Sequence, residues 1–185
     1  MKKRILILGS SSFSGSSTIN YLLTKNKYQI IGTYRKKKSD RYLPYKFNIK
    51  SNNFKEYKVD FLKNPSSLIN LIKKLKPEVI IDFASICMVN ESWKNSNIYF
   101  QINVLSKIKM IEYLSSTKFL KKYIYISTPE IFGSSKKYIE EKSQTFAPQT
   151  PYATSKLSFE ILLKNFQKNF SFPLIISRFS NFYGP

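Results

Sequence analysis

Short apolar runs alternate with longer amphipathic stretches along most of this 185-residue chain. The runs are typical of buried strands, and the longer stretches repeat apolar residues at helical spacing. We expect strands at Arg4–Leu8, Gln29–Tyr34, Lys58–Phe61, Glu78–Phe83, Tyr123–Ser127 and Leu174–Ser177. We expect helices at Ser14–Thr24, Ser66–Leu75, Ser96–Leu114 and Pro151–Phe166. This order predicts an α/β fold with βαβ units and a parallel sheet that is covered on both faces.

Right-handed crossovers between successive strands turn this order into a doubly wound, Rossmann-type parallel sheet with helices on both faces. Hydrophobic residues make up 42% of the chain and aromatic residues 16%, which is enough for a real core. Open sheets of this kind bind ligands at the carboxyl ends of their strands. We therefore look for the functional residues just after each expected strand.

Composition excludes several kinds of chemistry. The chain has no histidine, which rules out Ser-His-Asp and Cys-His catalysis. With Cys87 as its single cysteine, it has no Cys/His zinc site and no intramolecular disulfide framework, so we expect no metal. The longest apolar runs fall far short of the ~18 residues of a membrane span. We expect no membrane partner and a reducing, cytoplasmic location.

The formal net charge of +20 invites a nucleic-acid interpretation. Only four of the 31 basic residues are arginine, however, and the lysines are spread along the whole chain. Arginine carries much of specific base recognition, so we expect no nucleic-acid partner. A small polyanionic ligand fits this composition better, and Arg35–Lys38 is the one dense basic run.

A Ser/Gly turn joins the first expected strand to the first expected helix, with the sequence Gly9-Ser10-Ser11-Ser12-Phe13-Ser14-Gly15. Backbone N–H groups in such a turn, together with a helix N-terminus, can bind a pyrophosphate. Gly9 would supply the tight turn, and Gly15 would let the helix pack closely on the sheet. The candidate cofactor-binding residues here are Gly9, Ser12, Phe13, Ser14 and Gly15. The alternative is an ordinary turn that caps the helix.

The ends of the next strands supply further candidates. The second strand runs into Arg35, with no acidic residue before Asp40, and an arginine here pairs with the 2′-phosphate of NADP. Arg35 therefore favours NADP over NAD, unless the basic run is a solvated loop. The carboxylate of Asp60, beside Phe61, could accept from the adenine amino group. The small side chains in Phe83-Ala84-Ser85 would let the backbone approach the cofactor.

Tyr152 and Lys156 stand at positions i and i+4 of the helix that Pro151 begins, and so share one face. We expect the lysine ammonium to stabilise the phenolate and to lower the pKa of Tyr152 toward neutrality. Tyr152 could then act as a general acid and base on a sugar hydroxyl or carbonyl. Thr128, directly after the fifth expected strand, could hydrogen-bond the same reacting oxygen.

Taken in order, these motifs resemble the extended short-chain dehydrogenase/reductases, and specifically the NAD-dependent epimerase/dehydratase group that acts on nucleotide sugars. The resemblance covers the whole chain. It is carried by Gly9-x-x-Ser12-x-x-Gly15, Asp60, Phe83-Ala84-Ser85, Asn103, Ser127-Thr128, Tyr152-x-x-x-Lys156 and Arg178-Phe179-Ser180-Asn181-Phe182-Tyr183-Gly184-Pro185.

Within the group, two stretches are similar to nucleotide-sugar 4,6-dehydratases: Met88-Val89-Asn90-Glu91-Ser92-Trp93 and Thr128-Pro129-Glu130. The resemblance implies that Tyr152 takes the C4 hydroxyl proton, that Glu130 removes the C5 proton, and that Thr128 and Lys156 support Tyr152. It also implies that Asn181 approaches the bound nucleotide sugar. A C4 epimerase or a keto-sugar reductase, which needs no Glu130, is the alternative, and a non-catalytic dinucleotide-binding sensor is a second one.

Two residues depart from the family's pattern. Ser12 replaces the usual middle glycine of the turn, and Pro129 stands where several relatives have an Asp that protonates the departing C6 hydroxyl. The resemblance also implies a C-terminal substrate domain that is missing here. We therefore expect residues 1–185 to be the NAD(P)-binding Rossmann domain of a longer protein, inactive alone. The resemblance further implies a homodimer through the helices near Ser96–Leu114 and Pro151–Phe166.

Overall fold

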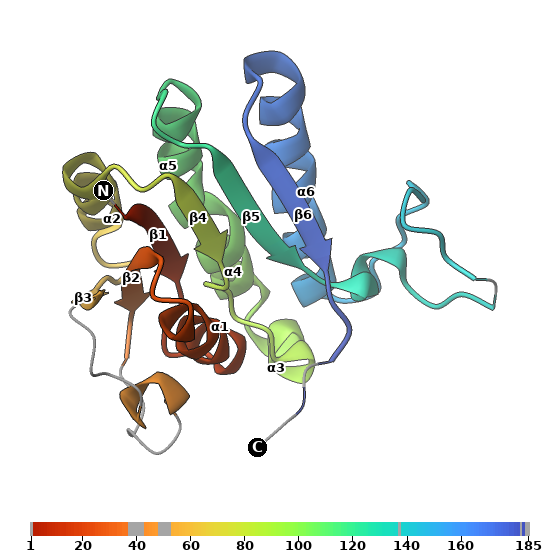
Figure 1. Ribbon diagram of the computed structural model, residues 1–185. Coiled ribbons are helices and arrows are strands. Elements are labelled where there is room, and N and C mark those ends of the chain that lie inside the picture. Colours follow the sequence, from red (N-terminus) through yellow and green to blue (C-terminus); the bar gives the residue numbers. More distant parts are fainter. Residues whose placement is uncertain (1, 37–42, 48–52, 137, 182, 184–185) are drawn as a thin grey trace.

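The computed structural model describes residues 2–36, 43–47, 53–136, 138–181 and 183. Six parallel strands form one sheet in the order β3-β2-β1-β4-β5-β6, which confirms the expected doubly wound Rossmann topology (Figure 1). The strands are β1 (Lys3–Leu8), β2 (Tyr28–Tyr34), β3 (Phe54–Lys58), β4 (Val79–Asp82), β5 (Lys122–Ser127) and β6 (Leu174–Arg178). Their order reverses between β1 and β4, at the point where such sheets bind ligands.

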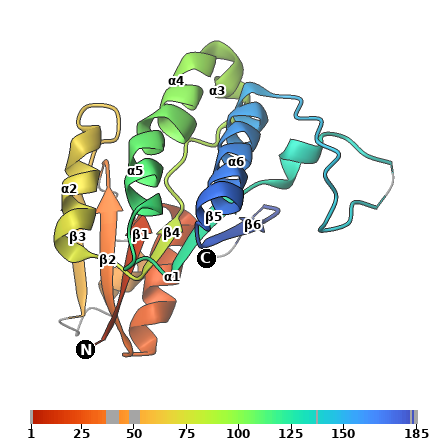
Figure 2. The same cartoon turned by 90° about the horizontal axis from the view of Figure 1, so that it is seen from above.

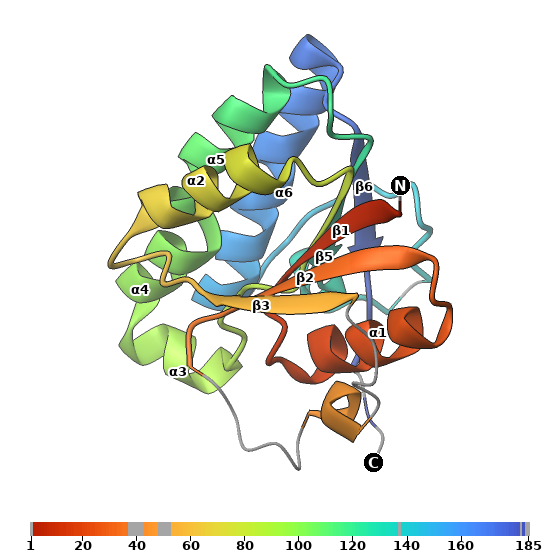
Figure 3. The same cartoon turned by 60° about the vertical axis from the view of Figure 1, so that its left-hand side comes forward.

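Helices cover both faces of the sheet. The helix α1 (Phe13–Thr24) lies on one face, with the 3-10 turn η2 (Pro44–Phe47) beside it, as Figure 3 shows. The other face carries α2 (Pro65–Leu75), α5 (Ser106–Ser115) and α6 (Pro151–Phe170) (Figure 2). Shorter segments complete the described chain: α3 (Val89–Lys94), α4 (Ser96–Phe100), the π-helical turn η3 (Gln101–Leu105) and the 3-10 turn η4 (Pro129–Phe132).

The core divides into two clusters because side chains alternate across each strand. In β1, Ile5 and Ile7 face α1 and η2, where they pack with Ile19 and Tyr45. Leu6 and Leu8, which alternate with them along the strand, belong to the larger cluster under α2, α5 and α6. Each face of the sheet is therefore sealed by apolar packing, and polar chemistry is left to the carboxyl edge.

Side-chain caps fix where the main helices begin. Ser12 caps α1 by accepting a hydrogen bond from Gly15 N at 3.0 Å. Thr150 caps α6 by accepting from Ala153 N at 3.0 Å, and Pro151 fills the first helical position, where a missing N–H costs nothing. Both caps stand at the carboxyl edge, so they also set the position of the candidate site.

The expected third strand, Lys58–Phe61, is wrong. The strand is Phe54–Lys58, which pairs with β2 from Ile30↔Phe54 to Tyr34↔Lys58. The apolar residues that favoured the later position follow Lys58, where the pairing with β2 ends. There Asp60 Oδ1 accepts from Leu62 N and Lys63 N and turns the chain out of the sheet.

The expected single helix Ser96–Leu114 is divided into α4, η3 and α5. A π-helical turn inserts an extra residue and rotates the face that follows it. Leu105, which continues the helical spacing of the apolar residues Ile98 and Ile102, is 58% exposed, whereas Lys107 is 1% exposed. The apolar period therefore predicts the helix correctly but not which of its residues are buried.

Candidate active site

The first part of the site is the contact between the turns that follow β1 and β4. Gly9 has a φ of +83°, and a Cβ there would lie 3.1 Å from Phe83 C and 3.2 Å from Ala84 N. Only glycine fits that conformation without strain and leaves room for the second turn. The structure thus brings three candidate cofactor residues together at the carboxyl edge.

Ser12 closes the turn with its own side chain. Its hydroxyl donates to Gly9 O at 2.8 Å and accepts from Gly15 N. A Cβ on Gly15 would lie 2.3 Å from Gly9 O, so this position also requires glycine. The turn ends at the N-terminus of α1, where Phe13 and Ser14 begin the helix and the helix dipole favours a negatively charged group.

The remaining cofactor candidates lie at the ends of β2 and β3. Arg35 is exposed just beyond β2, and residues 37–42, which include Lys37, Lys38 and Asp40, are outside the described residues. Asp60 holds its own turn, and Phe61 packs partly buried against the larger core cluster. The roles given to Arg35, Asp60 and Phe61 remain predictions.

The catalytic candidates meet between the end of β5 and the start of α6. Thr128 and Tyr152 are both buried, and the Thr128 hydroxyl lies close enough to the Tyr152 phenol to act against the rise in its pKa. Thr128 Oγ1 also accepts from Glu130 N at 3.3 Å and so caps η4. The sequence-derived grouping of Thr128, Glu130 and Tyr152 is thus matched by their proximity.

Burial dominates the titration of this group. Burial raises the pKa of Tyr152 to about 12, and the nearby Cys87 and Glu130 add to that rise. The expectation that Lys156 lowers the pKa of Tyr152 is therefore wrong for this chain. Lys156 Nζ instead donates to Ile126 O at 2.6 Å, and burial, followed by the charge of Lys107, lowers its own pKa to about 7.

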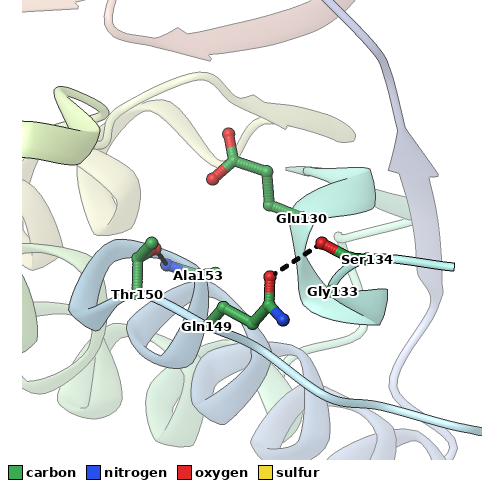
Figure 4. A pocket seen from close by; sticks show the side chains of 6 residues that line it. All are labelled: Glu130, Gly133, Ser134, Gln149, Thr150 and Ala153. Atoms are coloured by element: carbon green, nitrogen blue, oxygen red, sulfur yellow. Dashed lines mark hydrogen bonds between the residues drawn. The ribbon is translucent and has the colours of Figure 1, made fainter.

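Glu130 lines an open pocket of about 190 Å³ beside this group. Figure 4 shows the lining residues Glu130, Gly133, Ser134, Gln149, Thr150 and Ala153. Ser134 Oγ donates to Gln149 Oε1 at 3.0 Å across the pocket, and partial burial raises the pKa of Glu130. A carboxylate with a raised pKa is suited to accepting a proton from a ligand in this pocket.

These observations define a dinucleotide-type turn and a Thr-Tyr-Lys group on one sheet edge. Comparison with known proteins gives the same assignment. The sequence pattern of the NAD dependent epimerase/dehydratase family matches residues 5–185, which is nearly the whole chain.

The chain belongs to this family. A dTDP-D-glucose 4,6-dehydratase of Dictyostelium discoideum is 33% identical over 201 residues, which cover 99% of this chain and 44% of that protein. A UDP-glucuronic acid 4-epimerase of Bacillus cereus, solved with UDP-glucuronic acid and NAD, superposes with a TM-score of 0.86 at 27% identity, over 98% of this chain and 58% of the other. A dTDP-glucose 4,6-dehydratase of Bacillus anthracis, solved with NAD, superposes with a TM-score of 0.83 at 27% identity, over 99% of this chain and 56% of the other. This epimerase/dehydratase chain spans about half the length of these relatives.

The substrate candidate of the epimerase/dehydratase motif is Asn181, which is exposed beyond the end of β6. Its neighbours Phe182, Gly184 and Pro185 lie outside the described residues, so the role of Asn181 remains a prediction. Arg178, earlier in the same motif, binds the buried carboxylate of Glu160 from α6 through Nε and NH2. It also donates from NH1 to Glu141 O at 3.3 Å and so ties the long loop before α6 to β6.

Sequence reasoning missed a buried polar cluster next to the candidate catalytic residues. Lys107 Nζ donates to Asp82 Oδ2 at 2.7 Å, and Tyr123 OH donates to the same oxygen at 2.8 Å. One signal was available: Asp82 ends an otherwise apolar strand, and charged residues are almost never fully buried unless paired. Lys107 had no such signal, because the π-helical turn η3 rotates it inward.

No helix of the described chain has the length and apolar character that a membrane crossing requires. Among the same residues, no group of three or more His, Cys, Asp or Glu side chains could hold a metal ion.

Proposed function

We propose that this chain carries the cofactor site and the catalytic residues of a nucleotide-sugar 4,6-dehydratase. The observation that carries the proposal is Glu130, which lines the pocket, follows Thr128 in η4 and lies near enough to Tyr152 to raise its pKa. Epimerisation and reduction at C4 need the tyrosine, but only loss of water across C5 and C6 needs a second base at this position. The two dehydratases among the relatives described above support the choice.

A dinucleotide fits the residues that are present. Glycine at positions 9 and 15, where a Cβ would meet neighbouring backbone, lets the turn, the β4 end and the N-terminus of α1 lie close together. Gly9, Ser12, Phe13, Ser14 and Gly15 would hold the pyrophosphate, with Phe83, Ala84 and Ser85 beside them. Arg35 would meet a 2′-phosphate if the ligand is NADP. When bound, NAD(P) would accept the hydride from sugar C4 and return it to C6.

The protein's own groups would handle the protons. Tyr152 would accept the C4 hydroxyl proton as the C4–H bond breaks, and the nearby Thr128 hydroxyl would stabilise the resulting phenolate. Lys156, which is half-protonated near pH 7, would supply positive charge to the same site. Glu130 would remove the C5 proton as the C6 hydroxyl takes a proton from solvent and leaves as water. Glu130 would then return its proton to C5 when the hydride is added at C6. Pro129 has no acidic group that could donate a proton to the departing C6 hydroxyl.

The test is incubation of the protein, with its chain extended as far as the reading frame runs, with dTDP-glucose and with GDP-mannose. A 4-keto-6-deoxy product from either supports the proposal, and its absence from both contradicts it. Glu130→Gln is expected to lower product formation by about 10²–10⁴-fold. Glu140→Gln, an exposed carboxylate in the loop before α6, is the matched control and should have no effect.

A C4 epimerase is the second candidate, and the fit to the Bacillus cereus 4-epimerase favours it. An epimerase would keep its activity in Glu130→Gln but lose it in Tyr152→Phe. The same pair of variants therefore separates the two functions.

Cofactor choice has its own test, because the solved relatives described above carry NAD whereas Arg35 would pair with NADP. We expect Arg35→Ala to weaken NADP binding about tenfold, the loss of one charged contact, and to leave NAD binding unchanged. Lys27→Ala, at the opposite end of β2, is the control. Equal NADP affinity in wild type and Arg35→Ala removes Arg35 from the site.

A homodimer is also part of the proposal. Leu105 and Ile98 are exposed on the α4–η3 segment, and Ile161 is exposed on α6. These apolar side chains are available for helix packing against a second copy. Sedimentation of a single species of monomer mass, at concentrations up to the millimolar range, would contradict the dimer. A cytoplasmic location remains the expectation.

A further inference from the structure

A buried ion pair lies next to the site but has no part in the reaction as proposed above. Lys107 of α5 and Asp82 of β4 are 2.7 Å apart from Nζ to Oδ2, and their side chains are only 1% and 0% exposed. Burying two charges costs several kcal/mol of hydration per ion, so such a pair is weak evidence for stability. This cost directs attention to what else the pair contacts.

Asp82 connects the pair to the cofactor edge. Its other oxygen, Oδ1, accepts from Ala84 N at 3.0 Å. Ala84 N belongs to the turn that packs directly against Gly9, where an added Cβ would lie 3.2 Å from this nitrogen. Asp82 therefore holds the β4 turn with one oxygen and binds Lys107 with the other.

Lys107 connects the pair to the catalytic lysine. Its Nζ lies 5.9 Å from the centre of the Tyr125 ring, and Lys156 Nζ lies 4.4 Å from the centre of the same ring. Tyr125 is the register partner of Asp82 in β5, and its hydroxyl donates to Lys156 O at 3.3 Å. One buried aromatic side chain thus contacts both ammonium groups.

Several charges act on Lys156. Its burial is the largest cause of its low pKa, and the positive charge of Lys107 is the second. Acidic groups oppose them from three places: Asp82 at the end of β4, the Cys87 thiol after it, and Glu160 one turn further along α6. The phenols of Tyr125 on β5 and Tyr152 on α6 complete the titratable groups around it. Lys107 is thus the one other cation in this described set.

We propose that Asp82 and Lys107 are positioning residues, whose ion pair holds the β4 turn in place and sets the charge carried by Lys156. The catalytic consequence rests on the proposed function, because it assumes that Lys156 serves Tyr152. The electrostatic effect of Lys107 on Lys156 does not depend on the proposed function. In this arrangement, the buried carboxylate of Asp82 holds the turn at the cofactor edge and also binds Lys107, the cation that acts on Lys156.

The experiment follows Lys156 directly in the chain without substrate. The protein is labelled with [ε-¹³C]lysine, the Lys156 signal is assigned from the spectrum of Lys156→Met, and its shift is followed from pH 5 to pH 10. The wild-type signal should titrate near pH 7. In Lys107→Met the midpoint should rise by about 1 pH unit, because a like charge is removed. The sign is the same whether or not Asp82 keeps its charge, because Lys107 acts more strongly than Asp82.

The double variant Asp82→Asn/Lys107→Met protects the test against misfolding. It leaves no unpaired buried charge and keeps an oxygen for Ala84 N, and its midpoint should also rise. Lys94→Met removes a lysine from an exposed ion pair with Glu91 and is the matched control, with no expected shift. An unchanged Lys156 midpoint in either folded variant overturns the proposal. Since no turnover is measured, failure of the dehydratase assay leaves this result intact.

Discussion

Lys156 donates a hydrogen bond of 2.6 Å from Nζ to the main-chain oxygen of Ile126 in β5. This contact fixes the lysine against the sheet, while the phenol of Tyr152, one turn earlier on α6, lies beside Thr128. The two catalytic candidates therefore have separate protein partners. Their titrations are set by burial more than by each other.

Replacement of Lys156 should change how stability depends on pH. The folded chain holds the pKa of Lys156 at about 7, below its ordinary 10.5, so between these values the unfolded chain binds the extra proton. Wild-type stability should therefore rise with pH relative to Lys156→Met, by up to about 1.4 kcal/mol per pH unit. Urea unfolding from pH 6 to pH 9 measures this. Lys122→Met, exposed on β5, should run parallel to wild type, and parallel behaviour of Lys156→Met would refute the assignment.

Gly9→Ala should damage both folding and cofactor binding. The new Cβ would be forced toward Phe83 C and Ala84 N in a backbone conformation with φ of +83°. We expect a loss of about 1–3 kcal/mol in unfolding free energy and a matching loss of nicotinamide-cofactor affinity. Chemical denaturation and calorimetric titration give the two values. Ser17→Ala, exposed on α1, is the control, and wild-type cofactor affinity in Gly9→Ala would contradict the site.

Arg178→Met should destabilise the chain, because the carboxylate of Glu160 is fully buried and would lose its bidentate partner. We expect a cost of about 3 kcal/mol. The loop before α6 should also become easier to cleave, since Arg178 NH1 holds Glu141 O. Limited proteolysis with mass spectrometry measures how readily this loop is cleaved. The double variant Arg178→Met/Glu160→Gln should recover part of the stability, and a single variant as stable as wild type would show that the pair contributes nothing.

The sequence predicts the fold well because periodic apolar runs are a local signal. Five of the expected strands overlap β1, β2, β4, β5 and β6, and α1, α2 and α6 lie where helical spacing indicates. The strand at Phe54–Lys58 was missed because its edge position leaves it only partly buried, without a continuous apolar run. Pairing with β2, a long-range contact, defines it instead.

The candidate site was predictable where a short motif lies at a strand end. Gly9 and Thr128 are of this kind, whereas Tyr152 belongs to a motif in the first turn of α6, and the structure places all three at one edge. Lys107 was not predictable, because it reaches the interior only through the π-helical turn η3. The direction of the Tyr152 pKa was also predicted wrongly, since sequence spacing gives the neighbour on the helix but not the depth of burial.

The most direct test of the dehydratase proposal follows one hydrogen. dTDP-glucose and GDP-mannose, each deuterated at C4, are incubated with the extended protein and NAD(P), and the products are analysed by NMR. The account predicts deuterium at C6 of a 4-keto-6-deoxy sugar, with Glu130→Gln unable to form it. Deuterium that remains at C4, in a sugar epimerised there, would contradict the account.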